Sequence, residues 1–450
     1  MDAIVQKEET LTNTLYSDHL DSLKKIHEEA LEGIEAQGIL IHSGSDTLYF
    51  ADDRAIDFNA YGHYLRWIPV NKADQFLLFV PGETPKYLQT VPADYWYEQT
   101  VEFEEYFTED IQVIRIKLVS DVKAHIKNLK LCYLGPCETV ATSLDIASHN
   151  TNPRKIISYL DFQRAYKTEY EIVQVRNANK LALQGHKAAK ECFFSNGNEY
   201  DIHMSYLRAC NILEAECPYT NIVALGEKSA ILHYQKKRRG DAKNENVLLI
   251  DAGCRINGYA SDITRTIVKD NINPIFGDLL IGMEELELAL ADLVKPKVIY
   301  PDLHAEALKK ISELLLNLSI CTGSVGELLE RGIPNLFMPH GVGHLLGIQV
   351  HDVGGHLRDV TGAIESPPDS SPFLRNTRAI AKDMIFTIEP GCYFIPMLLE
   401  PHRYTKRGEL INWKVIEQLY PCGGVRIEDN VLVTDDGAEN LTRQFEETNL

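Results

Sequence analysis

The stretch VLLIDAGCRINGYASDITRTI, residues 247–267, predicts a β-hairpin from which the rest of the fold can be placed. Its first four residues are apolar, as in a buried strand, and they are followed by Asp251. Asn257-Gly258 favours a two-residue turn, because both central positions of that turn need a positive φ. We therefore expect residues 259–267 to return antiparallel to the first strand.

The pairing of this hairpin places two carboxylates on one face. Counting outward from Ile256 opposite Tyr259, Asp251 pairs with Thr264, and Asp262 becomes its diagonal neighbour on the same face. Diagonal neighbours lie about 7–8 Å apart at the backbone, and such carboxylates can share two cations about 3.5–4 Å apart. A solvated strand face is the alternative, but the apolar run indicates burial, and buried carboxylates need partners.

A second group of chemically active side chains lies in MPHGVGHLLGIQVHDV, residues 338–353. It contains His340, His344 and His351 among several glycines. The glycines disfavour a regular helix and predict a tight turn that leads into a strand. Histidine is a frequent ligand of divalent ions. One histidine is more often structural, but this grouping favours a functional site.

Two glutamates complete the set of candidates. Glu389 follows the apolar run at residues 384–388, which predicts a position at a strand end. In GGVRIEDN, residues 423–430, alternation places Arg426 and Glu428 on one face. An arginine beside a ligating glutamate can orient it or bind a substrate carboxylate. Each glutamate taken alone could equally be a surface residue.

The composition predicts a globular protein and excludes several classes of function. Hydrophobic residues make up 44% of the chain, enough for a sizeable core. The formal net charge of −20 has the wrong sign for binding nucleic acid. The nine cysteines occur singly, unlike those of a zinc ribbon or a disulfide framework. No segment resembles a signal peptide or a membrane span. We expect a soluble, cytoplasmic protein with no nucleic-acid or membrane partner.

The N-terminal part alternates between helix and strand patterns. The apolar spacing over residues 17–38 predicts an amphipathic helix. Apolar segments at residues 39–42, 75–80 and 130–134 predict strands. This alternation indicates a smaller α/β domain.

The length of 450 residues predicts two domains. A boundary is indicated near Lys167, because Thr168 and Glu171 have the spacing of a capping box at a helix start. We expect the N-terminal α/β domain over residues 1–166 and a catalytic domain, also mixed α/β (α+β), over residues 167–450. All of the motifs described above fall in the second domain.

Five segments of this second domain together resemble the pita-bread metallopeptidase family, and they occur in the order typical of that family. They are LLIDAG at 248–253, NGYASDITRT at 257–266, PHGVGH at 339–344, TIEPG at 387–391 and GGVRIEDN at 423–430. The resemblance implies a pita-bread fold for residues 167–450.

Within that family, further segments resemble bacterial Xaa-Pro dipeptidases and the similar organophosphorus acid anhydrolases. They are VALGEKSAILHY at 223–234, GIQVHDVGGH at 347–356, PFLRNTR at 372–378 and ADYW at 93–96. The segment DFNAYGHYLRW at 57–67 departs from the usual dipeptidase pattern. The resemblance implies hydrolysis of Xaa-Pro dipeptides, with organophosphorus compounds as side substrates.

The resemblance also implies the residues of the site. Two divalent ions, expected to be Mn²⁺, would be held by Asp251, Asp262, His344, Glu389 and Glu428, and both Asp262 and Glu428 would bridge them. The substrate would be surrounded by His233, His340, His351, Arg426, Tyr219, Tyr300 and Leu374. Asp53 would match an acidic residue that a partner subunit lends to the site, so a homodimer is expected.

This ligand set leads to a mechanistic hypothesis. Four carboxylates and one imidazole suit manganese or a similar hard ion, and a water bridging two ions is acidified toward neutral pH. The resulting hydroxide would attack the scissile carbonyl, while Glu389 passes the proton to the leaving nitrogen. His340 or His351 would stabilise the oxyanion, and Arg426 would receive the substrate carboxylate.

Two other functions remain open at the level of the sequence. An Xaa-Pro aminopeptidase acting on longer peptides would share the metal site and differ in whether the pocket is closed beyond proline. A pita-bread binding protein without metal chemistry would be expected to lose ligands, whereas every ligand position is filled here.

Overall fold

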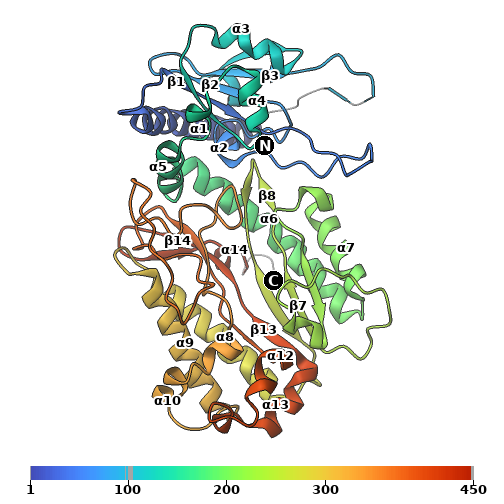
Figure 1. Cartoon of the computed structure of the whole chain (residues 1–450). Coiled ribbons are helices and arrows are strands. Elements are labelled where there is room, and N and C mark those ends of the chain that lie inside the picture. Colours follow the sequence, from blue (N-terminus) through green and yellow to red (C-terminus); the bar gives the residue numbers. More distant parts are fainter. Residues whose placement is uncertain (1, 97, 100–104, 447–450) are drawn as a thin grey trace. The chain divides into compact units, whose positions relative to one another are not determined.

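The computed structural model describes residues 2–96, 98–99 and 105–446 (Figure 1). The chain divides into two compact units. The first comprises Met1–Val173 with Asp359–Ala363, and the second comprises Gln174–Arg358 with Ile364–Leu450. Within the described ranges, no helix is long and apolar enough to cross a membrane.

The first unit is built on one mixed sheet. Its helices and strands are α1 (Asp2–Leu31), β1 (Gly38–His42), α2 (Gly62–Leu65), β2 (Phe76–Phe79), β3 (Lys86–Thr90), β4 (Gln112–Ile116), α3 (Val122–Ile126), β5 (Leu131–Leu134), α4 (Glu138–Ser143) and α5 (Arg154–Arg164). The strands lie in the order β4-β3-β2-β1-β5, with β1 antiparallel to β2 and parallel to β5. β1, β2 and β5 confirm the strands predicted in this part of the chain.

Helix α1 differs from the predicted helix at both ends. It begins at Asp2 instead of Ser17, because residues 2–16 contain many good helix formers and no glycine or proline. It ends at Leu31 instead of Gly38, and Gly33 follows with a left-handed φ of 65°. The predicted bounds were wrong because the apolar spacing begins after the first helical residues and continues past the last.

The second unit combines several small sheets with longer helices. Its elements are α6 (Glu169–Phe194, which begins in the first unit), α7 (Glu199–Cys210), β6 (Ile222–Leu225), β7 (Val247–Asp251), β8 (Arg255–Ile256), β9 (Tyr259–Ala260), β10 (Thr264–Val268), α8 (Pro274–Ala291), α9 (Tyr300–Asn317), α10 (Val325–Glu330), α11 (Pro334–Phe337), β11 (Ile385–Ile388), β12 (Gly391–Tyr393), α12 (Pro396–Leu399), α13 (Trp413–Leu419), β13 (Gly424–Arg426), β14 (Asp429–Val433), β15 (Ala438–Asn440) and α14 (Arg443–Glu446). The strand orders are β10-β7-β6, β11-β14-β15, β12-β13 and β8-β9. Helices α8 and α9 pack side by side (Figure 1).

The start of α6 is capped as predicted. The main-chain N–H of Thr168 donates to the Glu171 carboxylate at 2.9 Å, and the N–H of Glu171 donates to the Thr168 hydroxyl at 3.4 Å. Glu171 also accepts two hydrogen bonds from the buried guanidinium of Arg66, at 2.9 and 3.1 Å. The capping box is therefore confirmed, and Arg66 holds its carboxylate in place.

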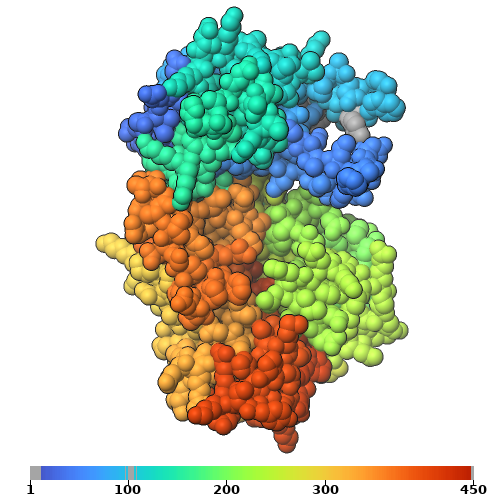
Figure 2. Space-filling model, in the orientation of Figure 1, coloured from blue at the N-terminus to red at the C-terminus, as the bar shows by residue number. Residues whose placement is uncertain are grey.

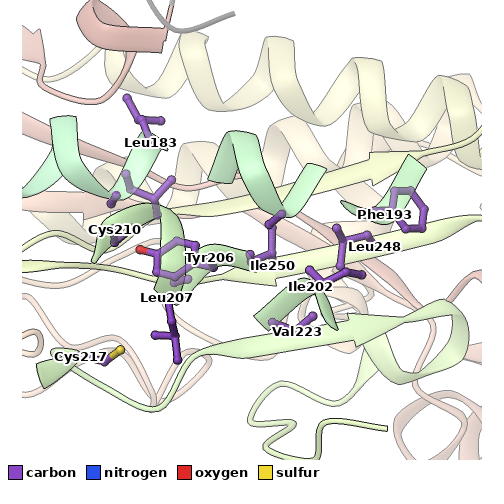
Figure 3. Close-up of a cluster of buried hydrophobic side chains, with 14 of the residues drawn as sticks. Leu183, Phe193, Ile202, Tyr206, Leu207, Cys210, Cys217, Val223, Leu248 and Ile250 are labelled. Carbon is purple, nitrogen blue, oxygen red and sulfur yellow. The ribbon is translucent and has the colours of Figure 1, made fainter. Parts of the chain in front are cut away.

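An apolar core fixes which way β7 faces. Figure 3 shows Leu248 and Ile250 of β7 among side chains of α6, α7 and β6, including Tyr206. Side chains alternate along a strand, so Leu249 and Asp251 must lie on the other face. Leu249 does pack in a separate cluster there. Burial of one face of β7 thus directs Asp251 away from the core.

The hairpin has the predicted register. Asp251 pairs with Thr264, and Ile256 pairs with Tyr259. The turn residues Asn257-Gly258 both have positive φ, 48° and 89°. The register continues between the short strands, where the N–H of residue 252 donates to the carbonyl of residue 263 at 3.0 Å.

Both candidate glutamates lie where the chain passes between two sheets. β11 pairs with β14 in one sheet, and β12 pairs with β13 in another. The chain leaves the first sheet at Glu389-Pro390 and returns to it at Ile427-Glu428. The strand end predicted at Glu389 is confirmed, while the strand pattern expected over residues 423–430 is interrupted by this change of sheet.

The histidine segment, residues 338–353, is irregular. The absence of a helix was predicted, but the strand expected after the turn is reduced to a single bridge between Leu345 and Phe386 of β11. Glycine is needed at Gly343, because a Cβ there would lie 1.9 Å from the carbonyl oxygen of Thr387. This close approach holds His344 against β11, where its N–H donates to the Thr387 hydroxyl at 3.1 Å.

Candidate metal centre

The described fold brings the predicted ligands together in the second unit. Donor atoms of Asp262, His344 and Glu428 lie within 4.8 Å of one another. Nε2 of His344 lies 3.4 Å from Oδ2 of Asp262 and 3.7 Å from Oε1 of Glu389. Asp251 lies on the same face of the hairpin as Asp262, as the register requires. Five residues that are far apart in sequence therefore form one cluster.

Three of the carboxylates in this cluster have raised pKa values. Burial raises the pKa of Glu428 well above its usual value, and the charges of Asp262, Glu389 and Asp251 raise it further. Burial raises the pKa of Glu389 to about 7, although His344 and Arg426 oppose this shift. Burial also raises the pKa of Asp251 against the effect of Arg426. The cluster is short of positive charge, which a cation would supply.

Asp262 and His344 stabilise each other's charged forms. Burial acts to raise the pKa of Asp262, but the hydrogen bond and charge of His344 hold it below its usual value. Burial acts to lower the pKa of His344, but Asp262 and Glu389 raise it. Nδ1 of His344 donates to the carbonyl of Leu345 at 3.1 Å. In the neutral ring, Nε2 then carries the lone pair that a metal requires.

Arg426 forms hydrogen bonds that link Asp251 to Thr264 and Tyr393. Its Nη2 donates to Oδ2 of Asp251 at 2.5 Å, its Nε to the Thr264 hydroxyl at 3.1 Å, and its Nη1 to the Tyr393 hydroxyl at 3.0 Å. The Thr264 hydroxyl in turn donates to Glu428 at 2.6 Å. Arg426 and Glu428 thus share the Thr264 hydroxyl, although the chain changes sheets between them.

The structure adds Thr264 and Tyr393 to the residues found from the sequence. The sequence places Thr264 only as the pairing partner of Asp251, whereas its side chain joins Arg426 to Glu428. Tyr393 lies in β12, shortly after Glu389, and no sequence motif points to it. Its signal in the sequence was weak, because an aromatic residue in a strand is usually part of the core.

His340 is held in a single neutral form. Its Nδ1 donates to the carbonyl of Gly341 at 2.7 Å, so its Nε2 accepts from the Tyr393 hydroxyl at 2.9 Å. Burial, aided by the charge of Arg426, lowers the pKa of His340 to about 3. His340 also approaches Glu389, with Nδ1 3.7 Å from Oε2. A directed chain of hydrogen bonds therefore runs from Arg426 through Tyr393 to His340.

The two other predicted histidines lie nearer the surface. The ring of His351 is exposed and meets that of His344 edge-on, with ring centroids 4.4 Å apart. His233 is exposed on the segment before β7, and its charge helps to lower the pKa values of both His340 and His351. Figure 2 shows green and orange parts of the second unit next to each other on the visible face.

The remaining predicted pocket residues differ in their positions. The Tyr219 hydroxyl has its pKa raised by burial and by Asp251, Asp262 and Glu428, which places it beside the carboxylates. Tyr300 is buried, and its hydroxyl donates to the Thr387 carbonyl at 3.1 Å. Leu374 is buried, and its carbonyl accepts from Nε2 of His356 at 2.8 Å. Asp53 belongs to the first unit, where it is exposed between β1 and α2.

The residues of this cluster fit a divalent metal. Oδ1 of Asp251 is buried and accepts no hydrogen bond from the part of the chain that the structure describes. A buried oxygen of this kind needs a partner. Carboxylates with one imidazole are ligands that suit manganese and other hard divalent ions. A cation would satisfy Asp251 and would offset the repulsion among the four carboxylates.

Comparisons with known proteins agree with this chemistry. Residues 173–435 match the model of metallopeptidase family M24, and residues 14–162 match that of the Xaa-Pro dipeptidase N-terminal domain. An Xaa-Pro dipeptidase of Pseudoalteromonas haloplanktis is 40% identical over 434 residues, which cover 96% of this chain and 98% of that protein. One from Shewanella loihica is 39% identical over 436 residues, with the same coverage.

Solved structures support the fold. Aminopeptidase P from Escherichia coli with the inhibitor Pro-Leu superposes with a TM-score of 0.73 at 21% identity, covering 94% of this chain and 97% of that one. Its zinc-substituted form in complex with product gives a TM-score of 0.72 at 20% identity, with the same coverage. The mixed α/β class and the pita-bread fold expected from the motifs are thereby confirmed. Since the family model spans more than half of the chain and the relatives match nearly all of it, this protein belongs to metallopeptidase family M24.

Proposed function

We propose that this metallopeptidase is an Xaa-Pro dipeptidase that uses two divalent ions. The observation that carries the proposal is the grouping of Asp262, His344 and Glu428, with Glu389 beside His344 and a buried Asp251 oxygen that accepts no hydrogen bond from the described residues. The ions would be held by Asp251, Asp262, His344, Glu389 and Glu428. Relatives named Xaa-Pro dipeptidase that match 96% of the chain support the choice of substrate.

The ions, when bound, would act as Lewis acids that polarise the scissile carbonyl and make a water molecule acidic near neutral pH. The proton of that water would pass to the Glu389 carboxylate, which lies 3.7 Å from Nε2 of His344 in the cluster. Glu389 would then deliver the proton to the leaving proline nitrogen. An Xaa-Pro bond is a tertiary amide, so its nitrogen needs a proton before it can depart.

The histidines would have separate roles. Both ring nitrogens of His340 are engaged, with Gly341 and with Tyr393, so His340 would orient the neighbouring groups. His351 is exposed beside His344, and it would donate a hydrogen bond to the oxyanion. His233, which is also exposed, would contact the substrate from the segment before β7. Arg426 would orient Asp251, because its guanidinium is engaged by Asp251, Thr264 and Tyr393.

The rival activity is that of an Xaa-Pro aminopeptidase, which would accept longer peptides. Rates with Leu-Pro and Leu-Pro-Pro-Gly, measured with and without a chelator, separate the two. We expect a strong preference for Leu-Pro and loss of activity with the chelator. Preference for the longer peptide would contradict the dipeptidase assignment, since it would mean that the pocket is open beyond proline.

A binding protein without metal chemistry is the second rival. Metal content can be measured directly on the purified protein, and calorimetry can follow the return of Mn²⁺ to chelator-treated protein. We expect two ions per chain. A chain that retains no metal, takes none up and cleaves no dipeptide would be a binding protein.

Further properties expected from the motifs remain part of the proposal. We infer Mn²⁺ as the working ion, a cytoplasmic location, and slow hydrolysis of organophosphorus fluorides or esters by the same site. We also infer a homodimer in which Asp53 of one chain enters the site of the other. Light scattering would test the dimer. If Asp53 enters the site of the other chain, an Asp53→Asn variant should show an increased KM.

A further inference from the structure

The side chain of Asn430 clamps the main chain of Asp262. Oδ1 of Asn430 accepts from the N–H of Asp262 at 3.1 Å, and its Nδ2 donates to the carbonyl of Asp262 at 2.5 Å. Asn430 is fully buried, in β14. The amide thus imitates a neighbouring strand at a point where Asp262 lies between β9 and β10 and belongs to no strand. Both main-chain groups of Asp262 are fixed by one side chain.

The side chain of Arg265 holds the main chain of Glu428 in a similar way. Its Nη1 donates to the carbonyl of Glu428 at 2.9 Å and to that of Thr264 at 3.0 Å. Its Nη2 donates to the carboxylate of Asp429 at 2.7 Å. Arg265 is buried, so these bonds are shielded from water. The arginine therefore supports Glu428 where the chain changes sheets.

The two clamps are reciprocal. Asn430 follows Glu428 by two positions and holds Asp262, while Arg265 follows Asp262 by three positions and holds Glu428. Neither clamp uses the carboxylates, which stay available to an ion. We propose that Arg265 and Asn430 are positioning residues that set the spacing of Asp262 and Glu428, and thereby the affinity for metal. This inference rests on the proposed metal site.

The clamps are themselves anchored by the C-terminal segment. Glu446 of α14 accepts from Nε of Arg265 at 2.9 Å and from its Nη2 at 3.2 Å. The Thr442 hydroxyl accepts from the N–H of Asn430 at 3.0 Å and donates to Asn179 at 2.8 Å. The segment at residues 442–446 thus supports both clamp residues, although it contributes no ligand of its own.

Metal binding by chelator-treated variants tests the proposal. Arg265→Lys keeps a positive charge but cannot bind the two carbonyls and Asp429 at the same time. Asn430→Ala removes both hydrogen bonds to the main chain of Asp262. We expect each to weaken Mn²⁺ binding about 10–100-fold in calorimetry, as losses of supporting groups usually do. We also expect the visible absorption of Co²⁺, bound in place of Mn²⁺, to change, because it reports the geometry of the ligands.

Arg176 offers a matched control. It makes two hydrogen bonds to Glu439 of β15 and one to Gln444 at 3.3 Å, and so fastens the C-terminal part of the chain without contacting Asp262 or Glu428. Arg176→Lys should lower the melting temperature and leave the metal affinity and the Co²⁺ spectrum unchanged. Should Asn430→Ala fail to fold, Glu446→Gln replaces it, since it weakens the direct anchor of Arg265 without altering either clamp residue and should weaken metal binding in the same direction.

The outcomes separate this inference from the proposed function. Wild-type affinity and an unchanged spectrum in the clamp variants would overturn the positioning role while leaving the metal site intact. Equal losses in the clamp variants and in Arg176→Lys would also overturn it, since they would indicate general loosening. A wild-type protein that binds neither ion would overturn the proposed function itself, and this inference with it.

Discussion

Nη2 of Arg426 lies 2.5 Å from Oδ2 of Asp251, and both side chains are buried. The bond engages one oxygen of the carboxylate and leaves Oδ1 without a hydrogen bond from the described residues. Since the guanidinium also binds Thr264 and Tyr393, it cannot turn toward a substrate without breaking this arrangement. Arg426 is thus suited to present one free oxygen of Asp251 to an ion.

Replacing Arg426 by lysine should show whether the metal site needs only the positive charge of Arg426 or also its hydrogen bonds. Arg426→Lys retains a positive charge beside Asp251 but cannot also reach Thr264 and Tyr393. We expect affinity for Mn²⁺ and kcat/KM for Leu-Pro both to fall about 10–100-fold. Calorimetry and steady-state kinetics measure these changes. If KM alone rose while metal affinity stayed constant, Arg426 would instead be a receptor for the substrate carboxylate.

A change at Asp262 should affect the metal site directly. Asp262→Asn keeps the size of the side chain but removes a negative charge and the ion pair with His344. We expect activity to fall at least about a hundredfold, with weaker metal binding. Asp270→Asn, an exposed residue after β10, is the control and should behave as wild type. Near-normal turnover of Asp262→Asn would refute the ligand assignment.

Metal binding should depend on pH through the raised carboxylate pKa values. Glu389 has a pKa of about 7 in the metal-free protein, and ligation needs the deprotonated form. Affinity should therefore increase as pH rises toward 7, by up to about tenfold per unit for one released proton, and should keep rising above 7 because the pKa of Glu428 is also raised. Calorimetry in buffers of different ionisation enthalpy counts the protons. Binding with no proton release at pH 6 would contradict the raised pKa.

The loop that carries His233 should depend on Glu199. This fully buried carboxylate accepts from Nε of Arg238 at 2.9 Å, the Tyr234 hydroxyl at 2.8 Å and the N–H of Leu225 at 3.2 Å. Glu199→Gln weakens this anchor, so we expect KM for Leu-Pro to rise about tenfold with little change in kcat.

A double variant shows whether Glu199 acts through the loop. If it does, combining Glu199→Gln with His233→Asn should raise KM no further than the larger single effect. Fully additive effects would mean that Glu199 matters for another reason, such as general stability.

Acid stability should depend on His27 in the first unit. Nδ1 of His27 donates to the carbonyl of Leu23, and its Nε2 accepts from Nε1 of Trp67 at 3.2 Å, so the ring is neutral. Burial lowers its pKa from 6.5 to about 3. Below pH 6.5 the unfolded chain therefore binds a proton at His27 that the folded chain does not bind. The free energy of unfolding that is present above pH 6.5 is lost as pH falls toward 3.

Urea unfolding at a series of pH values measures this loss. The contribution of His27 should be about 1.4 kcal/mol of unfolding free energy for each pH unit below 6.5. His27→Gln should be less stable at pH 8 but less sensitive to acid. Parallel curves for the two proteins would show that His27 does not carry the effect.

The parts of the site that could be predicted are those with local rules. The turn at Asn257-Gly258 set the register, and the register placed Asp251 beside Asp262. Likewise the capping pair at Thr168 and Glu171 marked a helix start. In each case a few neighbouring residues determine the local geometry, so that geometry can be predicted from one stretch of sequence.

The supporting bonds could not be predicted, because they join distant segments through side chains. Nothing near Asn430 in the sequence indicates that its amide binds the main chain of Asp262. The change of sheet at Glu428 likewise depends on pairing with β11 and β12, which lie well before it in the chain. Helix α1 was misjudged for a different reason, since its apolar spacing continues beyond its last residue.

The two-residue turn of the hairpin has a consequence for how this region can change over evolution. Side chains alternate along each arm, so one residue inserted between Ile256 and Tyr259 would shift the return strand by one position and turn Asp262 toward the opposite face. Two inserted residues would restore its direction. The metal site therefore constrains the turn twice, since its residues must accept a positive φ and its length can change only in steps of two residues.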